Sequence, residues 1–224
     1  YGVSISIGKF STWDDITDEE NDIDLTIDDS ELIPYCKAMD YYVEGLSIEK
    51  ADIKYLHFYK IIEYFSPIVS KKTSYEQLNQ RLDALQVIDR DSEYLESIFT
   101  LTKQYEVSLK DKELANTVLN ECIDITSLFS FLPDKLKKNI SKNCQFEVRN
   151  ITSLNSAKVE LVKTEIAGIL YATRNSIVHA KSNYSVTGKE CLEDDFEQLN
   201  IFMARLCECL FVWNGRQSKE FKLK

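Results

Sequence analysis

The sequence is poor in the residues that build turns, and it has no long apolar run. Its 224 residues include only 6 glycines and 3 prolines, too few for the many tight hairpins of an all-β protein. The longest apolar run, Ile166 to Ala172, spans seven residues, whereas crossing a bilayer takes roughly 20. Apolar residues make up 44% of the chain and charged residues 29%, which is typical of globular proteins in water. We therefore expect a soluble, all-α protein without membrane contact.

The chain also has few of the side chains that hold metal ions. It has 2 histidines and 6 scattered cysteines, whereas a zinc site needs paired Cys-x-x-Cys spacing or several histidines. The close pair Cys207 and Cys209 would point to different sides of a helix, and His57 lies in an aromatic stretch typical of a packed core. The P-loop, dinucleotide-binding, zinc-protease and nucleophile-elbow motifs are missing. We expect reduced, structural cysteines in a cytoplasmic protein, with no metal and no cofactor.

The net charge of −10 is concentrated at the N-terminus. Residues 1–31 hold ten acids and one base, so they carry −9 and leave −1 for the other 193 residues. Residues 1–10 alternate apolar and small polar side chains, which predicts one short strand, and the acidic stretch after them has no helical stripe. We expect an acidic segment over residues 1–31, either a linker or the tail of an upstream domain, and a helical domain over residues 32–224.

The rest of the chain contains one locally basic stretch. Residues 135–181 carry nine bases and three acids. A phosphate-binding surface would lie here, but a solvated helix face followed by a basic loop has the same composition. Both interpretations remain open at this point.

Apolar residues recur at helical spacing from Pro34 onward. A helix over 51–66 is apolar almost all round and should be central, ending at Pro67, and Ser74 with Gln77 forms a capping box that predicts a new helix start. The result is a bundle of long helices with a helical insertion between residues 70 and 150. The expected helices cover 34–45, 51–66, 74–85, a stretch from 91 through 119, short pieces at 128–132 and after Pro133, a long helix capped by Thr152 or Ser153, and 193–213.

Small and polar residues share one face of the long helix that ends near residue 179. Asn175 and His179 are four residues apart and therefore lie one above the other, and Ala172 and Gly168 extend this face upstream. A glycine inside a helix costs about 1 kcal/mol relative to alanine, which suggests a close approach by another helix. We therefore predict that Gly168, Ala172 and Asn175 lie at a two-fold interface. The alternative is an ordinary helix C-terminus whose cations complement the helix dipole.

The segment Arg174-Asn175-x-x-x-His179 resembles the R-x4–6-H motif of the HEPN superfamily of helical ribonucleases. The earlier stretch from Tyr55 to Phe65, which contains Glu63, resembles the aromatic helix of Apea-like HEPN domains. The resemblance covers roughly residues 34–216 and implies a helical bundle that pairs as a homodimer, with two motifs facing each other in one composite site. Family members are typically metal-independent RNA endonucleases in phage defence, toxin–antitoxin or related stress systems.

One position departs from part of that family. Members silenced by AMPylation have a tyrosine two residues after the histidine, and this chain has Lys181 there. This departure argues against regulation of that kind, although Tyr184 lies nearby.

The motif residues suit RNA cleavage without a metal. Histidine, with an unperturbed pKa of about 6.5, can act as base or acid near neutral pH, and the arginine fork suits phosphate oxygens. Arg174 and His179 are roughly 140° apart around a helix, so two chains bring both groups to one phosphate more easily than one chain does. The resemblance implies Arg174, Asn175 and His179 as catalytic residues, with Glu63 and Lys181 in support. Glu63 either orients Arg174 or lies solvated at the rim.

Three functions follow from the sequence. The first is a metal-independent RNA endonuclease with a composite site across a homodimer, acting in phage defence or a toxin-like stress response, with an upstream sensor domain as a further partner. The second is a non-catalytic HEPN-like module that binds RNA or nucleotides, or that dimerises. The third is an unrelated helical scaffold in which the motif is accidental.

Overall fold

The computed structural model describes residues 33–84, 92, 96, 100, 111–179 and 187–223. Within these ranges every regular element is helical, which confirms the expected all-α class. The strand expected at residues 1–10, the acidic segment 1–31, most of the helical stretch expected from 91 to 110, and Lys181 all lie outside the described residues.

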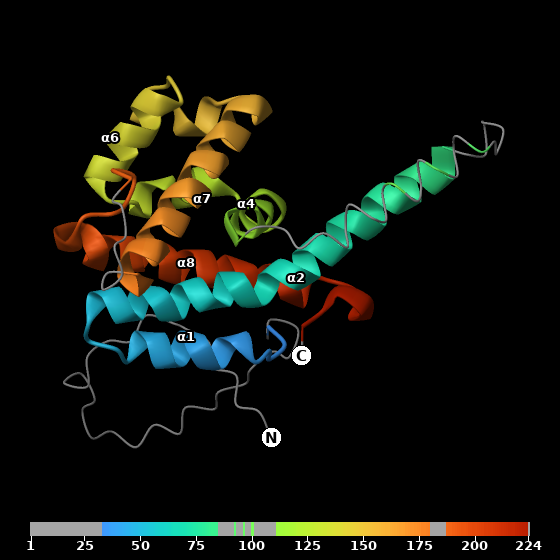
Figure 1. Cartoon of the computed structure of the whole chain (residues 1–224), viewed down its shortest axis with the longest axis horizontal. Helices are drawn as coiled ribbons and strands as arrows, with labels where there is room; N and C mark the ends of the chain where they lie inside the picture. The colour runs from blue at the N-terminus through green and yellow to red at the C-terminus, as the bar shows by residue number, and fades with distance from the viewer. Residues whose placement is uncertain are drawn as a thin grey trace, which may run out of the picture.

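Three helices form one side of the bundle: α1 (Ala38–Leu46), α2 (Ala51–Ala84) and α8 (Phe196–Gly215). α2 packs against both α1 and α8, which Figure 1 shows running alongside it. α1 begins four residues later than the expected start at Pro34. At its end, a Cβ on Gly45 would lie 3.0 Å from a ring carbon of Phe58, so glycine allows the close approach of α1 to α2.

The expected end of the central helix at Pro67 is wrong, because α2 continues without a break to Ala84. Proline lacks an N–H and normally costs about 3 kcal/mol inside a helix. Here Pro67 is exposed, while Phe65 and Val69 on either side of it are fully buried. Their packing stabilises both halves of one continuous helix. Ser74 accordingly does not cap a new helix, and its hydroxyl donates instead to the carbonyl oxygen of Ser70, at 2.7 Å.

The outer half of α2 extends away from the body of the molecule (Figure 1). Val69 is its last buried side chain among those that the structure describes in this helix. The region expected as an insertion thus begins with a helical arm of mostly polar composition. The start of this arm still contacts the C-terminal segment, where the rings of Tyr75 and Phe221 lie 5.5 Å apart.

A second group of helices covers α2 on another side. α4 (Asp111–Cys122) packs against α2 and also against α7 (Ser156–Val178). The ammonium of Lys163 on α7 donates to the carbonyl oxygen of Asn120 near the end of α4, at 3.0 Å. The remaining elements are α5 (Ile125–Leu128), α6 (Asp134–Asn143) and the 3₁₀ helices η3 (Phe129–Phe131), η4 (Val148–Ser153), η5 (Glu193–Asp195) and η6 (Lys219–Phe221).

The long helix α7 has a different cap from the one expected. Thr152 and Ser153 belong to η4, and Asn155 is the N-cap residue, its side-chain oxygen accepting from the backbone N–H of Lys158 at 2.9 Å. Asparagine is among the best N-cap residues because its short side chain reaches the free N–H groups of the first turn. The observed N-cap lies two or three residues after the expected one, and the long helix itself is present as expected.

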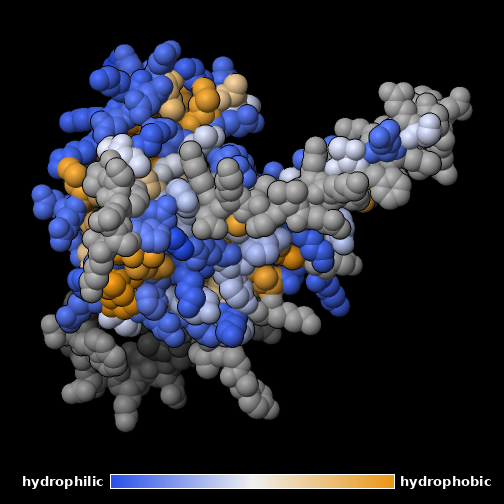
Figure 2. Space-filling view, viewed as in Figure 1, coloured by the Kyte–Doolittle hydropathy of each residue, from blue (hydrophilic) through white to orange (hydrophobic). Residues whose placement is uncertain are grey.

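The surface of the described part is mostly polar. Figure 2 shows hydrophilic side chains gathered over α6 and smaller apolar patches elsewhere on the same face. Among the described residues, no helix is long and apolar enough to cross a membrane.

Candidate functional site

Arg174 lies between two acceptors from different parts of the chain. Its Nη2 is 3.3 Å from Oε1 of Glu63 on α2, and its Nη1 donates to the side-chain oxygen of Asn175 at 3.0 Å. The Arg174 side chain is 24% exposed and that of Glu63 is 44% exposed. Glu63 thus contacts Arg174 and is also exposed at the rim, so the structure combines the two alternatives that the sequence left open. The guanidinium is thereby held at the surface, where an anion can reach it.

His179 lies at the C-terminal end of α7. It is the C-cap residue, and its backbone N–H donates to the carbonyl oxygen of Asn175 at 2.9 Å. The residue is exposed, whereas Arg174 one and a half turns earlier is half-buried. The motif therefore has two different members. Arg174, within α7, has a positively charged side chain held by hydrogen bonds, and His179, at the end of α7, is exposed.

Tyr55 fixes the position of α2 against α7 near this site, a role that the sequence analysis missed. Its hydroxyl donates to the carbonyl oxygen of Leu170 at 2.7 Å, and the residue is fully buried. Leu170 lies one turn before Arg174, and Tyr55 lies two turns before Glu63. The aromatic stripe marked Tyr55 as a core residue, but no sequence signal identified its hydrogen-bond partner.

Thr173 holds the chain segment that returns to the bundle after His179. Its side-chain oxygen accepts from the backbone N–H of Cys191 at 2.9 Å, and Thr173 itself is fully buried. The described part of that segment is further organised by Glu190, whose carboxylate accepts from the N–H groups of Thr187 and Gly188. The segment is thus tied to α7 next to Arg174.

The prediction that small residues of α7 form a two-fold interface is wrong. Gly168 and Ala172 are buried within the single chain, so they provide no free surface for a second copy. Their small size serves packing inside the bundle, as a glycine in mid-helix suggested. Asn175 is half-buried, and its side-chain oxygen accepts a hydrogen bond from Arg174.

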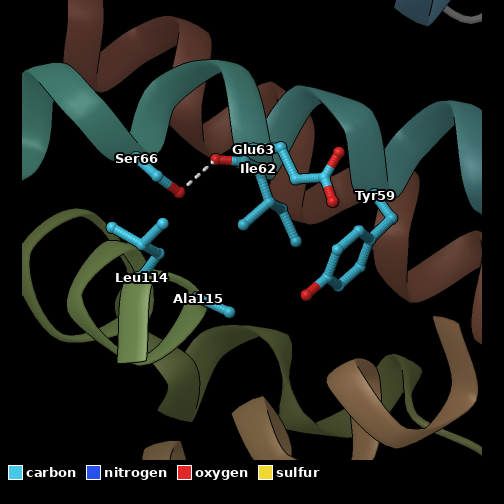
Figure 3. A pocket seen from close by; sticks show the side chains of 6 residues that line it. All are labelled: Tyr59, Ile62, Glu63, Ser66, Leu114 and Ala115. Carbon is cyan, nitrogen blue, oxygen red and sulfur yellow. Dashed lines mark hydrogen bonds between the residues drawn. The ribbon is translucent and has the colours of Figure 1, made fainter. Parts of the chain in front are cut away.

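A pocket of about 140 Å³ opens beside Glu63, between α2 and α4. Figure 3 shows the Tyr59 ring extending from α2 toward α4, with the Glu63 carboxylate against α2 on the side of Tyr59. The hydroxyl of Ser66, also at the pocket, donates to the carbonyl oxygen of Ile62 at 2.7 Å. The lining residues are Tyr59, Ile62, Glu63, Ser66, Leu114 and Ala115.

Most of the described bases in the stretch 135–181 have partners within the chain. Lys158 donates to the carbonyl oxygen of Cys144 at 2.7 Å, and four other bases of this region lie within 4 Å of acids. This pairing favours a solvated, ion-paired face over a dedicated phosphate-binding surface. The pairs are Lys135–Asp195, Lys137–Asp134, Arg149–Glu147 and Arg174–Glu63.

The cysteines are free thiols, as expected. Burial raises the pKa of Cys191 to about 12, with a smaller contribution from the negative charge of Asp195, so this thiol is a poor nucleophile at neutral pH. His57 is half-buried, with Nδ1 3.8 Å from a carboxylate oxygen of Glu44, at the boundary of the core. In the part of the chain that the structure describes, no three His, Cys, Asp or Glu side chains cluster as metal ligands.

The chain matches no protein-family model, no curated protein and no solved structure. The features that point to a function are therefore those of the chain itself. They are Arg174 held by Glu63 and Asn175, His179 exposed at the end of the same helix, and the pocket beside Glu63.

Proposed function

We propose that this chain is a metal-independent RNA endonuclease of the HEPN type, with Arg174 and His179 as its principal catalytic residues. The observation that supports it is the arrangement of Arg174, which is held by Glu63 and Asn175 on the helix that ends at the exposed His179. Arginine is the side chain best suited to two oxygens of a phosphate. We further propose, as the resemblance implies, that the activity serves phage defence or a toxin-like stress response.

The proposed reaction uses the internal 2′-hydroxyl of the RNA as nucleophile. A base removes the 2′-hydroxyl proton, the 2′-oxygen bonds to phosphorus, and the bond from phosphorus to the 5′-oxygen breaks. An acid protonates the leaving 5′-oxygen, and Arg174 stabilises the charge that develops on the non-bridging oxygens. The products are a 2′,3′-cyclic phosphate and a 5′-hydroxyl.

The reaction needs two proton-transfer groups, and each chain supplies one histidine at the motif. A homodimer would provide both, one His179 as base and the other as acid. Asn175 would keep Arg174 in place, and Lys181 would add positive charge close to the phosphate. Because Gly168 and Ala172 are buried, the dimer contact would have to use other surfaces near the end of α7.

The ends of the RNA fragments test this proposal. Purified protein is incubated with mixed RNAs in EDTA, and the fragment ends are identified by their susceptibility to phosphatase and kinase. Cleavage in EDTA that leaves 2′,3′-cyclic phosphates is the expected result. Activity that appears only with added metal, or fragments that end in 3′-hydroxyls, would contradict it.

The second candidate function is a non-catalytic HEPN-like module that binds RNA or dimerises. It is favoured by the carboxylate of Glu63, which already occupies one donor of Arg174 and reduces the positive charge offered to a phosphate. RNA binding measured by filter retention without any cleavage, under the same conditions, would support this candidate over the ribonuclease.

A further inference from the structure

Positive charge is concentrated where the outer half of α2 meets the segment that follows α8. Residues 67–80 and 213–224 together contain six bases and two acids, a net charge of +4, whereas the other residues from 32 to 224 carry −5. This excess lies outside the stretch 135–181, whose bases are mostly paired. A local excess of positive charge on an otherwise acidic chain favours an anionic partner at that place.

The two segments contact each other in the folded chain. The ring centroids of Tyr75 on α2 and Phe221 on η6 are 5.5 Å apart, and Figure 1 shows the C-terminal segment, in red, beside α2. The fully buried Asn214 holds this segment, because its side-chain amide donates to the carbonyl oxygen of Leu223 at 3.3 Å and its side-chain oxygen accepts from the N–H of Leu223 at 2.9 Å. The position of Phe221 against Tyr75 is therefore set by the fold.

Three exposed cations at this junction make no ion pair with a described residue. They are Lys71, Arg216 and Lys219. Lys72 differs from them, since its ammonium lies 2.7 Å from a carboxylate oxygen of Glu76. Cations that no carboxylate of the chain neutralises are available to phosphates, and a nucleic acid gains affinity from such contacts by releasing its counterions.

An exposed aromatic ring lies among these cations. Tyr75 is 46% exposed. The ammonium of Lys71 lies 5.5 Å from the centroid of its ring, and the ring of Phe221 packs edge-on against it. The ring is therefore held in place by its neighbours while nearly half of the residue stays accessible. Proteins that bind single strands combine these two elements, because cations follow the backbone and bases stack on aromatic side chains.

We propose that Lys71, Tyr75, Arg216, Lys219 and Phe221 form a basic–aromatic surface that binds single-stranded nucleic acid. A base stacks on Tyr75, and the phosphates on either side of it lie against the cations. A duplex does not suit this surface, since its bases are stacked on one another and present no face to a tyrosine.

The basic–aromatic surface and Arg174 are connected through one continuous helix. Glu63, which contacts Arg174 at 3.3 Å, precedes Lys71 by eight residues of α2, a rise of about 12 Å. A strand on this surface is therefore bound near the proposed catalytic residues. The choice of RNA as the natural strand rests on the proposed function, whereas binding of a single strand does not require cleavage.

The acidic segment 1–31 is the competing occupant. It carries −9, and the described chain begins beside Gly215, where an added Cβ would lie 3.6 Å from Ile33. Carboxylates would need the cations of the surface but not the ring of Tyr75. The contribution of that ring to binding therefore distinguishes a nucleic acid from the acidic segment.

Binding of a single strand that cannot be cleaved provides the first test. The intact chain is titrated into a fluorescent 2′-O-methyl RNA of about 12 nucleotides, within the site sizes of single-strand binding proteins, and anisotropy is measured in EDTA. Tyr75→Ala should weaken binding at least about five-fold, the lower end of base–aromatic stacking, and Tyr75→Phe should preserve it. Tyr75→Leu keeps an apolar side chain beside Phe221 but has no aromatic face, so it should weaken binding even if Tyr75→Ala disturbs the fold. Unchanged affinity of Tyr75→Leu would overturn the proposal.

The salt dependence of binding tests the cations. Each phosphate contact on a single strand contributes about 0.7 to the slope of log K against log salt concentration, so Lys71→Gln combined with Lys219→Gln should lower the slope by about 1.4. Lys138→Gln is the matched control, an exposed lysine on α6 without an ion pair among the described residues, and should leave the slope unchanged. An unchanged slope in the double variant would overturn the proposal. So would NMR shifts in residues 14–31 of that variant without weaker RNA binding, because they would assign the surface to the acidic segment.

Two further measurements separate this surface from the ribonuclease. Binding of the uncleavable strand that depends on Tyr75, by a chain that cleaves no ordinary RNA, supports the surface and contradicts the ribonuclease. Cleavage of ordinary RNA by a chain whose affinity for the strand is the same in Tyr75→Leu and the double lysine variant overturns the surface and leaves the ribonuclease standing. A duplex of the same sequence bound as tightly as the single strand would also overturn the proposal.

Discussion

The guanidinium of Arg174 lies 3.3 Å from the carboxylate of Glu63, although 111 positions separate the two residues in the chain. The pair joins α7 to α2 at the surface, with 24% and 44% of the side chains exposed. Ion pairs of this exposure contribute only about 0–1 kcal/mol to stability. The main consequence of the ion pair is therefore geometric, because the contact with Glu63 orients the guanidinium of Arg174 at the surface.

Replacing either motif residue should abolish RNA cleavage while the fold persists. Arg174→Ala removes the phosphate ligand, and His179→Ala removes the acid–base group, which is worth about 10² to 10⁴ in rate. His179 is exposed, so its loss should change the free energy of unfolding by less than about 0.5 kcal/mol. Cleavage rates and urea denaturation of each variant provide the measurements. Wild-type cleavage by His179→Ala would rule out its catalytic role.

Mixing the two inactive variants tests whether the site is shared between chains. A mixed dimer keeps one Arg174 and one His179 on different chains, so partial activity should return if the two motifs face one phosphate. Each variant incubated alone at the same total concentration is the control. No recovery, despite exchange of subunits demonstrated by mass spectrometry, would argue for a site within one chain.

The contact between Glu63 and Arg174 should appear as coupling in a double-mutant cycle. Glu63→Ala releases one side of the guanidinium, and we expect a roughly ten-fold lower cleavage rate from its poorer orientation. The same substitution in an Arg174→Lys background, which keeps a positive charge but not the guanidinium fork, should lower the residual rate by a smaller factor. Glu113→Ala, a substitution of an exposed glutamate on α4, is a control for the loss of a surface charge. Equal effects of Glu63→Ala in both backgrounds would show that Glu63 acts independently of Arg174.

Enlarging Gly168 should destabilise the folded chain rather than affect only its association. The residue is buried in α7, and extra side-chain volume in a packed core costs about 1–3 kcal/mol. Gly168→Leu should lower the free energy of unfolding by that amount, measured by urea denaturation at several protein concentrations. Leu161→Ala, an exposed position on the same helix, should change it by less than about 0.5 kcal/mol. Unchanged stability of Gly168→Leu would contradict the packing of this helix.

Stability should decrease at alkaline pH because of buried thiols. Burial raises the pKa of Cys191 to about 12, whereas a thiol in an unfolded chain has a pKa of about 8.5. The folded state therefore keeps its proton more firmly, so the contribution is complete below pH 8.5 and is lost as pH rises toward 12. Urea denaturation in reducing buffer at pH 7.5 and pH 9.5 measures the decrease, which should be smaller in Cys191→Ala. Equal pH dependence in that variant would show that Cys191 does not contribute.

The boundaries of the helices show which local signals were reliable. Asn155 caps α7 two or three residues after the expected position because a 3₁₀ turn occupies residues 148–153. The expectation that a proline ends a helix failed at Pro67. Phe65 and Val69 are buried on either side of it, and their packing stabilises one continuous helix. Capping boxes and prolines depend on neighbours in sequence, and tertiary packing overrides them where it supplies more free energy.

The sequence by itself determined the helical class and the spacing of Arg174, Asn175 and His179, because both depend on residues within a few turns of one helix. Only the tertiary structure decided that Glu63 meets Arg174, that Gly168 lies inside the chain, and that a pocket opens beside Glu63. These features depend on how α2, α4 and α7 pack against one another. Side chains brought together from distant positions leave no periodic pattern in the sequence, so their meeting becomes visible only once the helices are assembled.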